Sequence, residues 1–267
     1  MSLGWALVTG ATGGLGGALA RRLAERGHDL VLVGRSAERL CSVSASLEAD
    51  HPIATAQVVL DLSRPGSAEQ LLSVVSDRQL DVVALAASSY AYGAYSALEV
   101  GRHDALLGCN VLSHARLLHG LLHQLDAQGH GRVLVVGSQG ALLPAPGHAA
   151  YSASKAWLHQ LVRSLQAERR SAPVTLTLAC PGGMATPMLL QSPAWDILQH
   201  RWLVRAALLT PEQAARSMLA GLDTGQHLVI PGWLNRTIAL VSCLLPPGLA
   251  VRLSVWMYRP RRGRGAG

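Results

Sequence analysis

The sequence predicts an α/β fold with a single domain, in which helices cover both faces of a doubly wound, parallel, seven-stranded sheet. Two observations lead to this prediction. Short β-branched or apolar runs alternate with helical stretches along the chain, and such alternation requires crossover connections between parallel strands. A glycine-rich turn follows the first run and leads at once into a helical stretch. The expected strands are Trp5–Thr9, Leu30–Val33, Ala56–Leu60, Val82–Ala86, Arg132–Val136, Val174–Ala179 and Leu228–Ile230.

Composition and length agree with one packed domain. The chain has 267 residues, of which 49% are hydrophobic and 15% are charged, so a large core can form. No repeat or linker divides it, and we expect one domain over residues 1–258 and a disordered basic tail over residues 259–267. Four arginines of this tail supply more than half of the formal net charge of +7. The nearly neutral remainder argues against a protein that binds nucleic acid.

The cysteines and the chain ends bear on the compartment. The four cysteines lie far apart without a C-x-x-C pair, which predicts small buried side chains in a reducing environment. They are Cys41, Cys109, Cys180 and Cys243. The first residues lack the basic segment of a signal peptide, which predicts a cytoplasmic protein. Arg236, Pro246, Pro247 and Arg252 interrupt the apolar C-terminal region, so no integral membrane segment is expected.

The glycine-rich turn predicts a dinucleotide site of the Rossmann type. Thr9–Gly16 lies between the first strand and a helix expected over Gly17–Arg26. Glycines let the backbone approach a pyrophosphate, while the helix N-terminus presents free N–H groups and the positive end of its dipole. Taken alone, the glycines also fit a purely structural turn. The expected cofactor contacts in this turn are Thr9, Gly10, Thr12, Gly13, Gly14, Leu15 and Gly16.

The residue that follows the second strand and its glycine favours NADPH or NADP+ over NADH. Enzymes that prefer NADH usually place an acidic residue at this point, on the ribose hydroxyl. This chain has Arg35, whose guanidinium matches the oxygens of a 2′-phosphate. The alternative is a solvated surface arginine without a ligand.

Tyr151 and Lys155 stand four residues apart, on one face of an expected helix. A phenol titrates near pH ~10, and a nearby cation that favours phenolate makes it a usable general acid or base near neutral pH. Lys155 is the only lysine among 23 lysine and arginine residues. Its retention indicates a task for a compact point charge, because a guanidinium is planar and larger.

Ser138 and Asn110 are two further candidate site residues. Ser138 follows the fifth strand, at the carboxyl end of the sheet, where such folds bind ligands. A serine hydrolase is not expected, because its nucleophile elbow needs glycine at the position of Val136. Asn110 is one of only two asparagines in the chain.

With the glycine turn, Asn110, Ser138, Tyr151 and Lys155 in this order and spacing, the chain resembles the short-chain dehydrogenase/reductase family, of the Tyr-x-x-x-Lys type, over about residues 4–232. The resemblance implies that Tyr151 protonates the substrate oxygen during hydride transfer and that Ser138 orients the carbonyl. It also implies that Lys155 binds the ribose and tunes Tyr151, so that both residues contact the cofactor. Asn110 would anchor a water molecule of a proton relay.

The resemblance extends the cofactor site to three further segments. Asp61 and Leu62 would contact the adenine. The segment after the sixth strand would cup the nicotinamide through Pro181, Gly182, Gly183, Met184 and Thr186. One departure concerns the family's Asn-Asn-Ala-Gly after the fourth strand, which Leu85-Ala86-Ala87-Ser88 replaces. Because Ala86, Ala87 and Ser88 are small, we still expect them to lie against the cofactor.

The segment around residues 186–210 corresponds to the substrate lid of the family and is rich in leucine, with Met188, Trp195 and Trp202. An apolar lid favours a hydrophobic ketone or aldehyde, although core packing explains the same residues. The expected substrate contacts are Ser138, Gln139, His148, Tyr151, Gly183 and Leu189. For His148, a solvent-facing loop position is the alternative.

No metal is expected. His119 and His123 have the spacing of two ligands on a helix, but no third ligand is apparent, and a solvated helix face explains them better.

The C-terminal region over residues 233–258 predicts two short apolar helices separated by Pro246 and Pro247, and it resembles the end of certain bacterial NADPH-dependent reductases of this family. These helices can cover the lid, mediate dimerisation, or rest on a membrane surface with their arginines toward anionic lipid, and we expect lid or dimer packing. By family habit, helices around Asn110–Leu125 and Tyr151–Glu168 would pair in a homodimer or homotetramer.

Together these observations predict an NADP-dependent oxidoreductase that reduces a hydrophobic ketone or aldehyde. An imine reductase, or a non-redox enzyme of secondary metabolism with the same fold, is the enzymatic alternative. The alternative of another class is a non-catalytic regulator that binds NADP.

Overall fold

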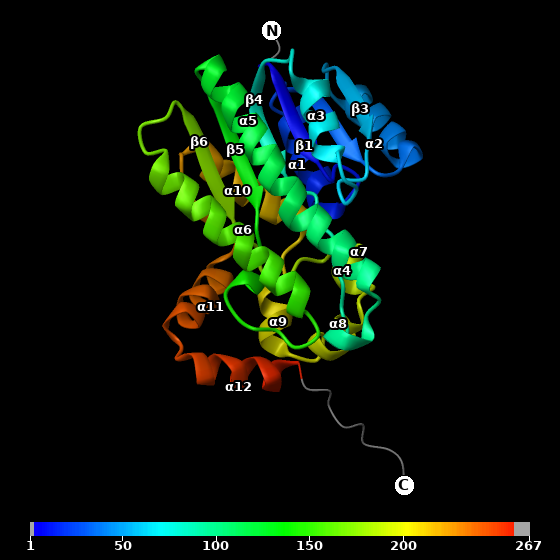
Figure 1. Ribbon diagram of the computed structural model, residues 1–267. Coiled ribbons are helices and arrows are strands. Elements are labelled where there is room, and N and C mark those ends of the chain that lie inside the picture. Colours follow the sequence, from blue (N-terminus) through cyan, green and yellow to red (C-terminus); the bar gives the residue numbers. More distant parts are fainter. Residues whose placement is uncertain (1–2, 259–267) are drawn as a thin grey trace.

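The computed structural model describes residues 3–258 and contains one sheet of seven parallel strands (Figure 1). The strand order is β3-β2-β1-β4-β5-β6-β7, so the chain builds one half of the sheet outward from β1 and then returns to build the other half from β4. This order confirms the doubly wound fold. The strands are β1 (Trp5–Thr9), β2 (Asp29–Gly34), β3 (Thr55–Val59), β4 (Leu80–Leu85), β5 (Gly131–Val136), β6 (Val174–Ala179) and β7 (Leu228–Val229).

Helices cover both faces of the sheet. They are α1 (Gly14–Ala24), α2 (Ala37–Asp50), α3 (Ser67–Val75), α5 (His114–Gln128), α6 (Ala149–Glu168) and α10 (Pro211–Asp223). A further helix, α4 (Val100–Leu107), precedes α5 and packs against α6 beyond the ends of the strands. Successive residues of a strand point to opposite faces, and Leu7 and Val8 of β1 accordingly belong to two different cores. The core around Leu7 includes Leu121 of α5, with α3 and α6 beside it. The core around Val8 includes Leu19 of α1 and Leu219 of α10.

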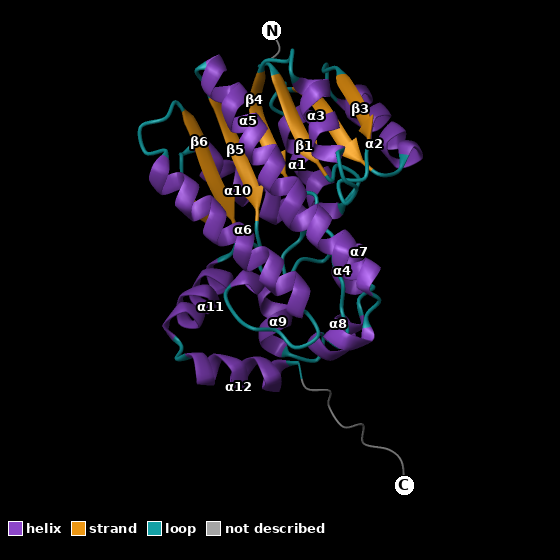
Figure 2. Cartoon of the chain, in the orientation of Figure 1, coloured by secondary structure: helices purple, strands orange, loops and turns teal. Residues whose placement is uncertain are grey.

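A second group of helices gathers where the strands end, at the lower end of the molecule in Figure 2. They are α7 (Pro187–Leu190), α8 (Pro193–Leu198), α9 (Trp202–Ala207), α11 (Trp233–Leu244) and α12 (Pro247–Met257). The first three form the segment predicted as a lid, and the last two form the predicted apolar C-terminal pair. The carboxyl ends of β4, β5 and β6 point toward this group, so the sheet and the lower helices enclose the region where a ligand is expected.

The first helix begins three residues earlier than predicted, at Gly14, with Gly13 as its N-cap. Gly16 lies in its first turn, where an added Cβ would be 2.1 Å from the carbonyl oxygen of Gly10. The glycines therefore serve the turn and the helix at once, which sequence reasoning assigned to the turn alone because glycine is a weak helix former.

The prediction that all four cysteines are buried is wrong for two of them. Cys109 and Cys180 are buried, whereas Cys41 of α2 and Cys243 of α11 lie on outward helix faces, and all four are free thiols. Within residues 3–258, no helix is both long and apolar enough to cross a bilayer. The predicted basic tail, residues 259–267, lies outside the described residues.

Candidate active site

The glycine turn after β1 forms a narrow cradle beside the end of β4. Gly10 has a φ of +72°, and a Cβ there would lie 2.9 Å from the Cα atom of Ala87. The N-cap of α1, Gly13, makes no side-chain hydrogen bond to the first turn, so no side chain of the cap occupies its N–H groups. On the other side, a Cβ on Gly14 would lie 2.9 Å from Cγ2 of Thr186. The cradle thus has the close backbone approach and the open helix N-terminus that a pyrophosphate requires.

Two arginines stand at the far end of this cradle. Arg35 follows β2 with its side chain exposed. Arg39, one turn further in α2, donates from Nη2 to the carbonyl oxygen of Thr12 at 2.5 Å. Arg39 was not among the predicted site residues. The signal that could have identified it is its place in the first turn of α2, directly after the loop that holds Arg35.

Asp61 lies within electrostatic reach of Arg35. Its Oδ1 atom accepts hydrogen bonds from the Ser63 N–H at 3.0 Å and from the Ser63 hydroxyl at 2.8 Å. Partial burial raises the pKa of Asp61. The hydrogen bonds from Ser63 and the charges of Arg35 and Arg64 lower it by more, so the pKa lies below its ordinary value. The neighbouring Leu62 side chain is 5% exposed and packs in the core, so a cofactor contact from Leu62 has to come from its backbone.

The segment after β4 is held without the asparagines of the family sequence. The Thr9 hydroxyl, at the end of β1, accepts from the N–H groups of Ala86 at 3.0 Å and Ala87 at 3.1 Å. Thr9 is itself 1% exposed, so its hydroxyl serves to position this segment. Ser88 donates from its hydroxyl to Oδ1 of Asn110 at 3.2 Å.

Asn110 is fully buried in a π-helical turn over Gly108–Ser113, between α4 and α5. Its Nδ2 atom donates to the Ser89 carbonyl at 2.9 Å and to the Ser154 hydroxyl at 3.1 Å. The Ser154 hydroxyl donates in turn to the Tyr151 carbonyl at 2.7 Å. The side-chain amide of Asn110 therefore links the segment after β4 to the first turn of α6, and the role of Asn110 as a water anchor stays a prediction.

Ser138, Tyr151 and Lys155 come together at the carboxyl end of β5. Ser138 directly follows this strand and Gly137, and its Oγ atom accepts from the Gly140 N–H at 3.0 Å. The Lys155 side chain is 1% exposed, and its Nζ atom donates to the Val136 carbonyl at 3.1 Å. Nζ lies 6.0 Å from the centroid of the Tyr151 ring. Only one of the three N–H donors of this ammonium has a partner among the described residues, so a ligand hydroxyl can accept from another.

Burial governs the titration of this group. Burial raises the pKa of Tyr151, although interaction with the Ser138 side chain lowers it in part. Burial also lowers the pKa of Lys155 to about 8. The expectation that Lys155 brings the Tyr151 phenol toward neutral pH is therefore wrong for the protein alone, since burial favours the neutral phenol.

An apolar cavity of about 290 Å³ opens beside Tyr151. The structure brings all six predicted substrate contacts to its wall: Ser138, Gln139, His148, Tyr151, Gly183 and Leu189. The remaining wall comes mainly from the loop after β5, the lid helices and the C-terminal pair, which contributes Ile238, Met257 and Tyr258 among others.

His148 lies inside the site, so the solvent-facing alternative for this residue is wrong. Its ring is 7% exposed and makes edge contacts with Tyr92 and Tyr258 at centroid distances of 4.9 and 5.0 Å. Burial lowers the pKa of His148 to about 4, which keeps the ring neutral near pH 7. Its Nε2 atom is buried without a hydrogen-bond partner among the described residues, so it is available to a polar group of a ligand.

Asn235 of α11 is a site residue that sequence reasoning missed. The side-chain Nδ2 atom of Asn235 donates to the Ala207 carbonyl at 2.9 Å, and the backbone carbonyl of Asn235 accepts from Nε2 of Gln139 at 2.7 Å. A Cβ on Gly182 would lie 2.3 Å from its Oδ1 atom. Asn235 therefore ties together the lid, the loop after β5 and the predicted nicotinamide segment. Its rarity was the available signal, since it is the second of the two asparagines.

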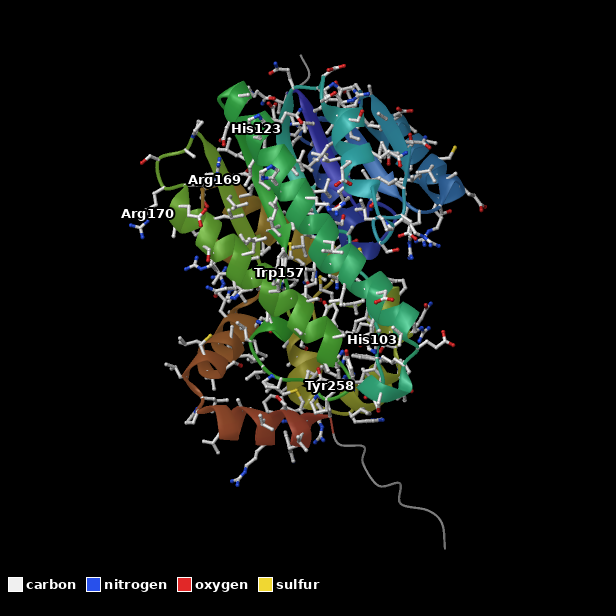
Figure 3. The ribbon with its side chains drawn as sticks, viewed as in Figure 1. His103, His123, Trp157, Arg169, Arg170 and Tyr258 are labelled. Carbon is white, nitrogen blue, oxygen red and sulfur yellow. The ribbon has the colours of Figure 1, made fainter. Side chains whose placement is uncertain are left out.

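The histidines with metal-like spacing lie away from the site. His119 and His123 are exposed on α5, and Figure 3 shows His123 near the opposite end of the molecule from Tyr258. Among residues 3–258, no three His, Cys, Asp or Glu side chains gather in a group that could hold a metal ion.

Comparison with known proteins places this site in a family context. The family model described as short chain dehydrogenase matches residues 4–196. A 7beta-hydroxysteroid dehydrogenase from Clostridium sardiniense is 28% identical over 192 residues, which cover 72% of this chain and 74% of the relative.

Solved structures share the fold over almost the whole chain. One that addresses 7beta-hydroxysteroid dehydrogenase stereoselectivity has a TM-score of 0.84 at 24% identity and covers 94% of this chain and 96% of its own. A short-chain dehydrogenase from Sphingobium yanoikuyae in complex with NADPH has a TM-score of 0.78 at 23% identity and covers 99% of both chains.

Proposed function

The chain belongs to the short-chain dehydrogenase family of oxidoreductases, and we propose that it is an NADPH-dependent reductase of a hydrophobic ketone or aldehyde. The observation that carries the proposal is the position of Ser138 and Tyr151 in the wall of an apolar cavity, with the buried Lys155 ammonium 6.0 Å from the centroid of the Tyr151 ring and a glycine cradle nearby.

The cofactor would lie along the carboxyl ends of β1, β2 and β4. The first turn of α1 would bind its pyrophosphate, and Arg35 and Arg39 would bind a 2′-phosphate, because planar guanidinium groups form paired bonds with phosphate oxygens. Lys155 would donate to the ribose. When bound, NADPH supplies the hydride for carbonyl reduction.

Tyr151 would donate its phenolic proton to the substrate oxygen. The raised pKa of Tyr151 keeps this proton in place at neutral pH, which is the form that reduction needs. The Ser138 hydroxyl would hold the same oxygen by a hydrogen bond. After the transfer, the buried ammonium of Lys155 would stabilise the phenolate, since two opposite charges attract strongly where water is excluded.

The substrate class follows from the cavity. Apolar residues, with leucine, methionine and tyrosine prominent among them, form most of its wall, and burial of apolar ligand surface contributes about 25 cal/mol per Å². Relatives named for hydroxysteroids support a large apolar substrate. His148 would hydrogen-bond a second polar group of that substrate through Nε2. A cytoplasmic location and a homo-oligomer that pairs α5 and α6 stay predictions.

The test is a titration of the purified protein with NADPH and NADH, followed by absorbance assays with medium and long-chain ketones, aldehydes and cyclic imines. We expect NADPH binding with oxidation by apolar carbonyls. Tyr151→Phe should lower turnover by about 10²-fold or more while NADPH still binds. Tyr92→Phe, which removes a nearby phenol that does not line the cavity, is the matched control and should keep its activity.

The alternatives predict different results. Oxidation by cyclic imines alone would identify an imine reductase. NADPH binding without oxidation across the panel would instead favour a non-redox enzyme or a regulator.

A further inference from the structure

The two C-terminal helices are packed with their small and polar residues inward. In α11 the buried residues are Asn235, Ala239 and Ser242. In α12 the most buried residues are Ala250 and Ser254. Ile238 and Met257 line the site cavity, but nine other large apolar side chains of the two helices are exposed: Trp233, Leu240, Val241, Leu244, Leu249, Val251, Leu253, Val255 and Trp256. We call these nine residues the C-terminal apolar face. Helices on a globular surface normally have the opposite pattern, so this face indicates an apolar partner outside the chain.

The positive charge of this region favours a partner with negative charge. From residue 224 to the end, the sequence contains no Asp or Glu and six arginines. Arg236 of α11 and Arg252 of α12 are exposed next to the apolar face, and the other four follow directly after Tyr258 in the sequence. Trp233 and Trp256 are 77% and 58% exposed, and tryptophan is the side chain that membrane interfaces prefer.

A second copy of the chain fits this surface poorly. A two-fold interface brings the same patch of both copies together, so the arginines of one copy would face those of the other. No acidic residue of this segment could compensate them. An anionic lipid surface supplies both the apolar layer and the opposite charge.

The face also adjoins the candidate active site. Met257 and Tyr258, at the end of α12, line the site cavity, and Figure 3 shows Tyr258 at the lower end of the molecule. An apolar groove of about 590 Å³ lies beside it, between α12 and the start of α6, with Val251, Val255 and Ala153 in its wall. The groove shares Ser254 and the loop residues 142–145 with the cavity.

We propose that the C-terminal apolar face binds the surface of an anionic lipid bilayer, with α11 and α12 lying in the plane of the interface. The apolar side chains enter the boundary between headgroups and acyl chains, and the exposed Arg236 and Arg252 contact the headgroups. Arg201 supports this arrangement from the lid side, because it stacks on the Trp256 ring at 4.4 Å and donates to the Trp256 carbonyl at 2.8 Å. The groove then opens beside the bilayer, from which a hydrophobic molecule can enter the cavity.

The test is flotation of the full chain with vesicles of phosphatidylcholine alone and of phosphatidylcholine with one quarter phosphatidylglycerol, at low and high salt. We expect binding to the anionic vesicles at low salt and much weaker binding in the other conditions. Trp233→Ser with Leu244→Ser should weaken the partition more than tenfold, because both side chains are three quarters exposed and line neither cavity. Arg252→Ser should weaken it about fivefold.

The matched control is Leu3→Ser with Trp157→Ser, which makes the same two changes on other exposed surfaces of the chain and should leave binding unchanged. Three results would overturn the proposal. The first is no flotation of the unaltered chain with anionic vesicles at low salt, and the second is equal loss in the two double variants. The third is a dimer in solution that Trp233→Ser with Leu244→Ser dissociates, which would identify the face as an interface between copies. Since flotation needs no turnover, its failure is distinguishable from failure of the proposed reductase activity.

Discussion

The side-chain amide of Asn110 pairs with the backbone of Ser89 through both of its groups. Oδ1 accepts from the Ser89 N–H at 2.8 Å, and Nδ2 donates to the Ser89 carbonyl at 2.9 Å. The Asn110 side chain thus forms with Ser89 the two hydrogen bonds that the backbone of a neighbouring strand would form, just beyond the end of β4. Together with the Thr9 hydroxyl, which binds Ala86 and Ala87, it fixes the segment after β4 beside the glycine cradle.

Replacement of Asn110 by alanine should destabilise the protein. The change removes both hydrogen bonds to the half-buried Ser89 backbone and the buried bond to the Ser154 hydroxyl, and the loss of a partner costs a buried polar group about 1–3 kcal/mol. We expect the free energy of unfolding in urea to fall by about 2–5 kcal/mol. Asn110→Asp keeps an acceptor but places a carboxyl group in a fully buried position without the amide donor, so it should also destabilise the protein. Full stability of Asn110→Ala would contradict the importance of this pairing.

The affinity for NADPH should depend on pH through Lys155. With a pKa of about 8, its ammonium is present below pH 8 and is lost above it. A neutral amine attracts the anionic cofactor less, so the dissociation constant of NADPH should rise by up to about tenfold from pH 7 to pH 9. Fluorescence titration at several pH values measures this change. Lys155→Met should bind more weakly at pH 7 and show no such rise, and an equal rise in both proteins would exclude Lys155 as its origin.

Arg35 and Arg39 should set the preference for the phosphorylated cofactor. A hydrogen bond to a charged group contributes about 1.5–3 kcal/mol, so Arg35→Ala and Arg39→Ala should each raise the KM for NADPH by about tenfold or more. The KM for NADH should change little, because NADH lacks the 2′-phosphate. Arg64→Ala is the matched control, since its side chain is 81% exposed and touches Asp61 only at 3.9 Å. A preference of the unaltered protein for NADH would disprove the assignment.

Acid should unfold the protein through its buried histidines. Burial lowers the pKa of both His114 and His148 from the ordinary 6.5 to about 4. Below pH 6.5 the unfolded chain takes up protons on these rings that the folded chain does not bind. The contribution of these two rings to the free energy of unfolding is therefore fully present above pH 6.5. It is lost as the pH decreases toward 4, by about 3 kcal/mol for each histidine.

Urea denaturation between pH 4 and pH 7 measures this loss. His148→Phe keeps an aromatic ring and cannot titrate, so its stability should fall less steeply with acidification. His123→Phe changes an exposed histidine of α5 and should retain the slope of the unaltered protein. Identical slopes in all three proteins would show that His148 does not contribute.

The strands were the most predictable part of the molecule. β1 and β6 begin and end where the sequence predicts, because each is a continuous apolar or β-branched run that stops at a glycine turn or before Pro181. A central parallel strand is buried on both faces, so its pattern depends little on the rest of the fold. The start of α1 was less predictable, since Gly16 is helical here for lack of space beside Gly10 and not for its propensity.

The site residues also differ in how well the sequence predicts their contacts. Tyr151 and Lys155 are close in sequence, so their spacing on one helix already predicted their proximity. Asn235 and Gln139 meet from positions 96 residues apart, and nothing in the local sequence of either predicts the contact. His148 directly precedes α6, and its side chain points inward because it packs against tyrosines that come close to it only in the folded chain.

The inward placement of Ala250 and Ser254 has a consequence for the cooperativity of the fold. Small side chains bury little apolar area, so α12 gains little free energy from its contact with the body of the protein. Its amide hydrogens should therefore exchange with solvent well before those of β4 or β5, through local opening that leaves the sheet intact. We therefore expect α12, which contributes Ser254 and Met257 to the cavity wall, to open locally at a small fraction of the free energy of global unfolding.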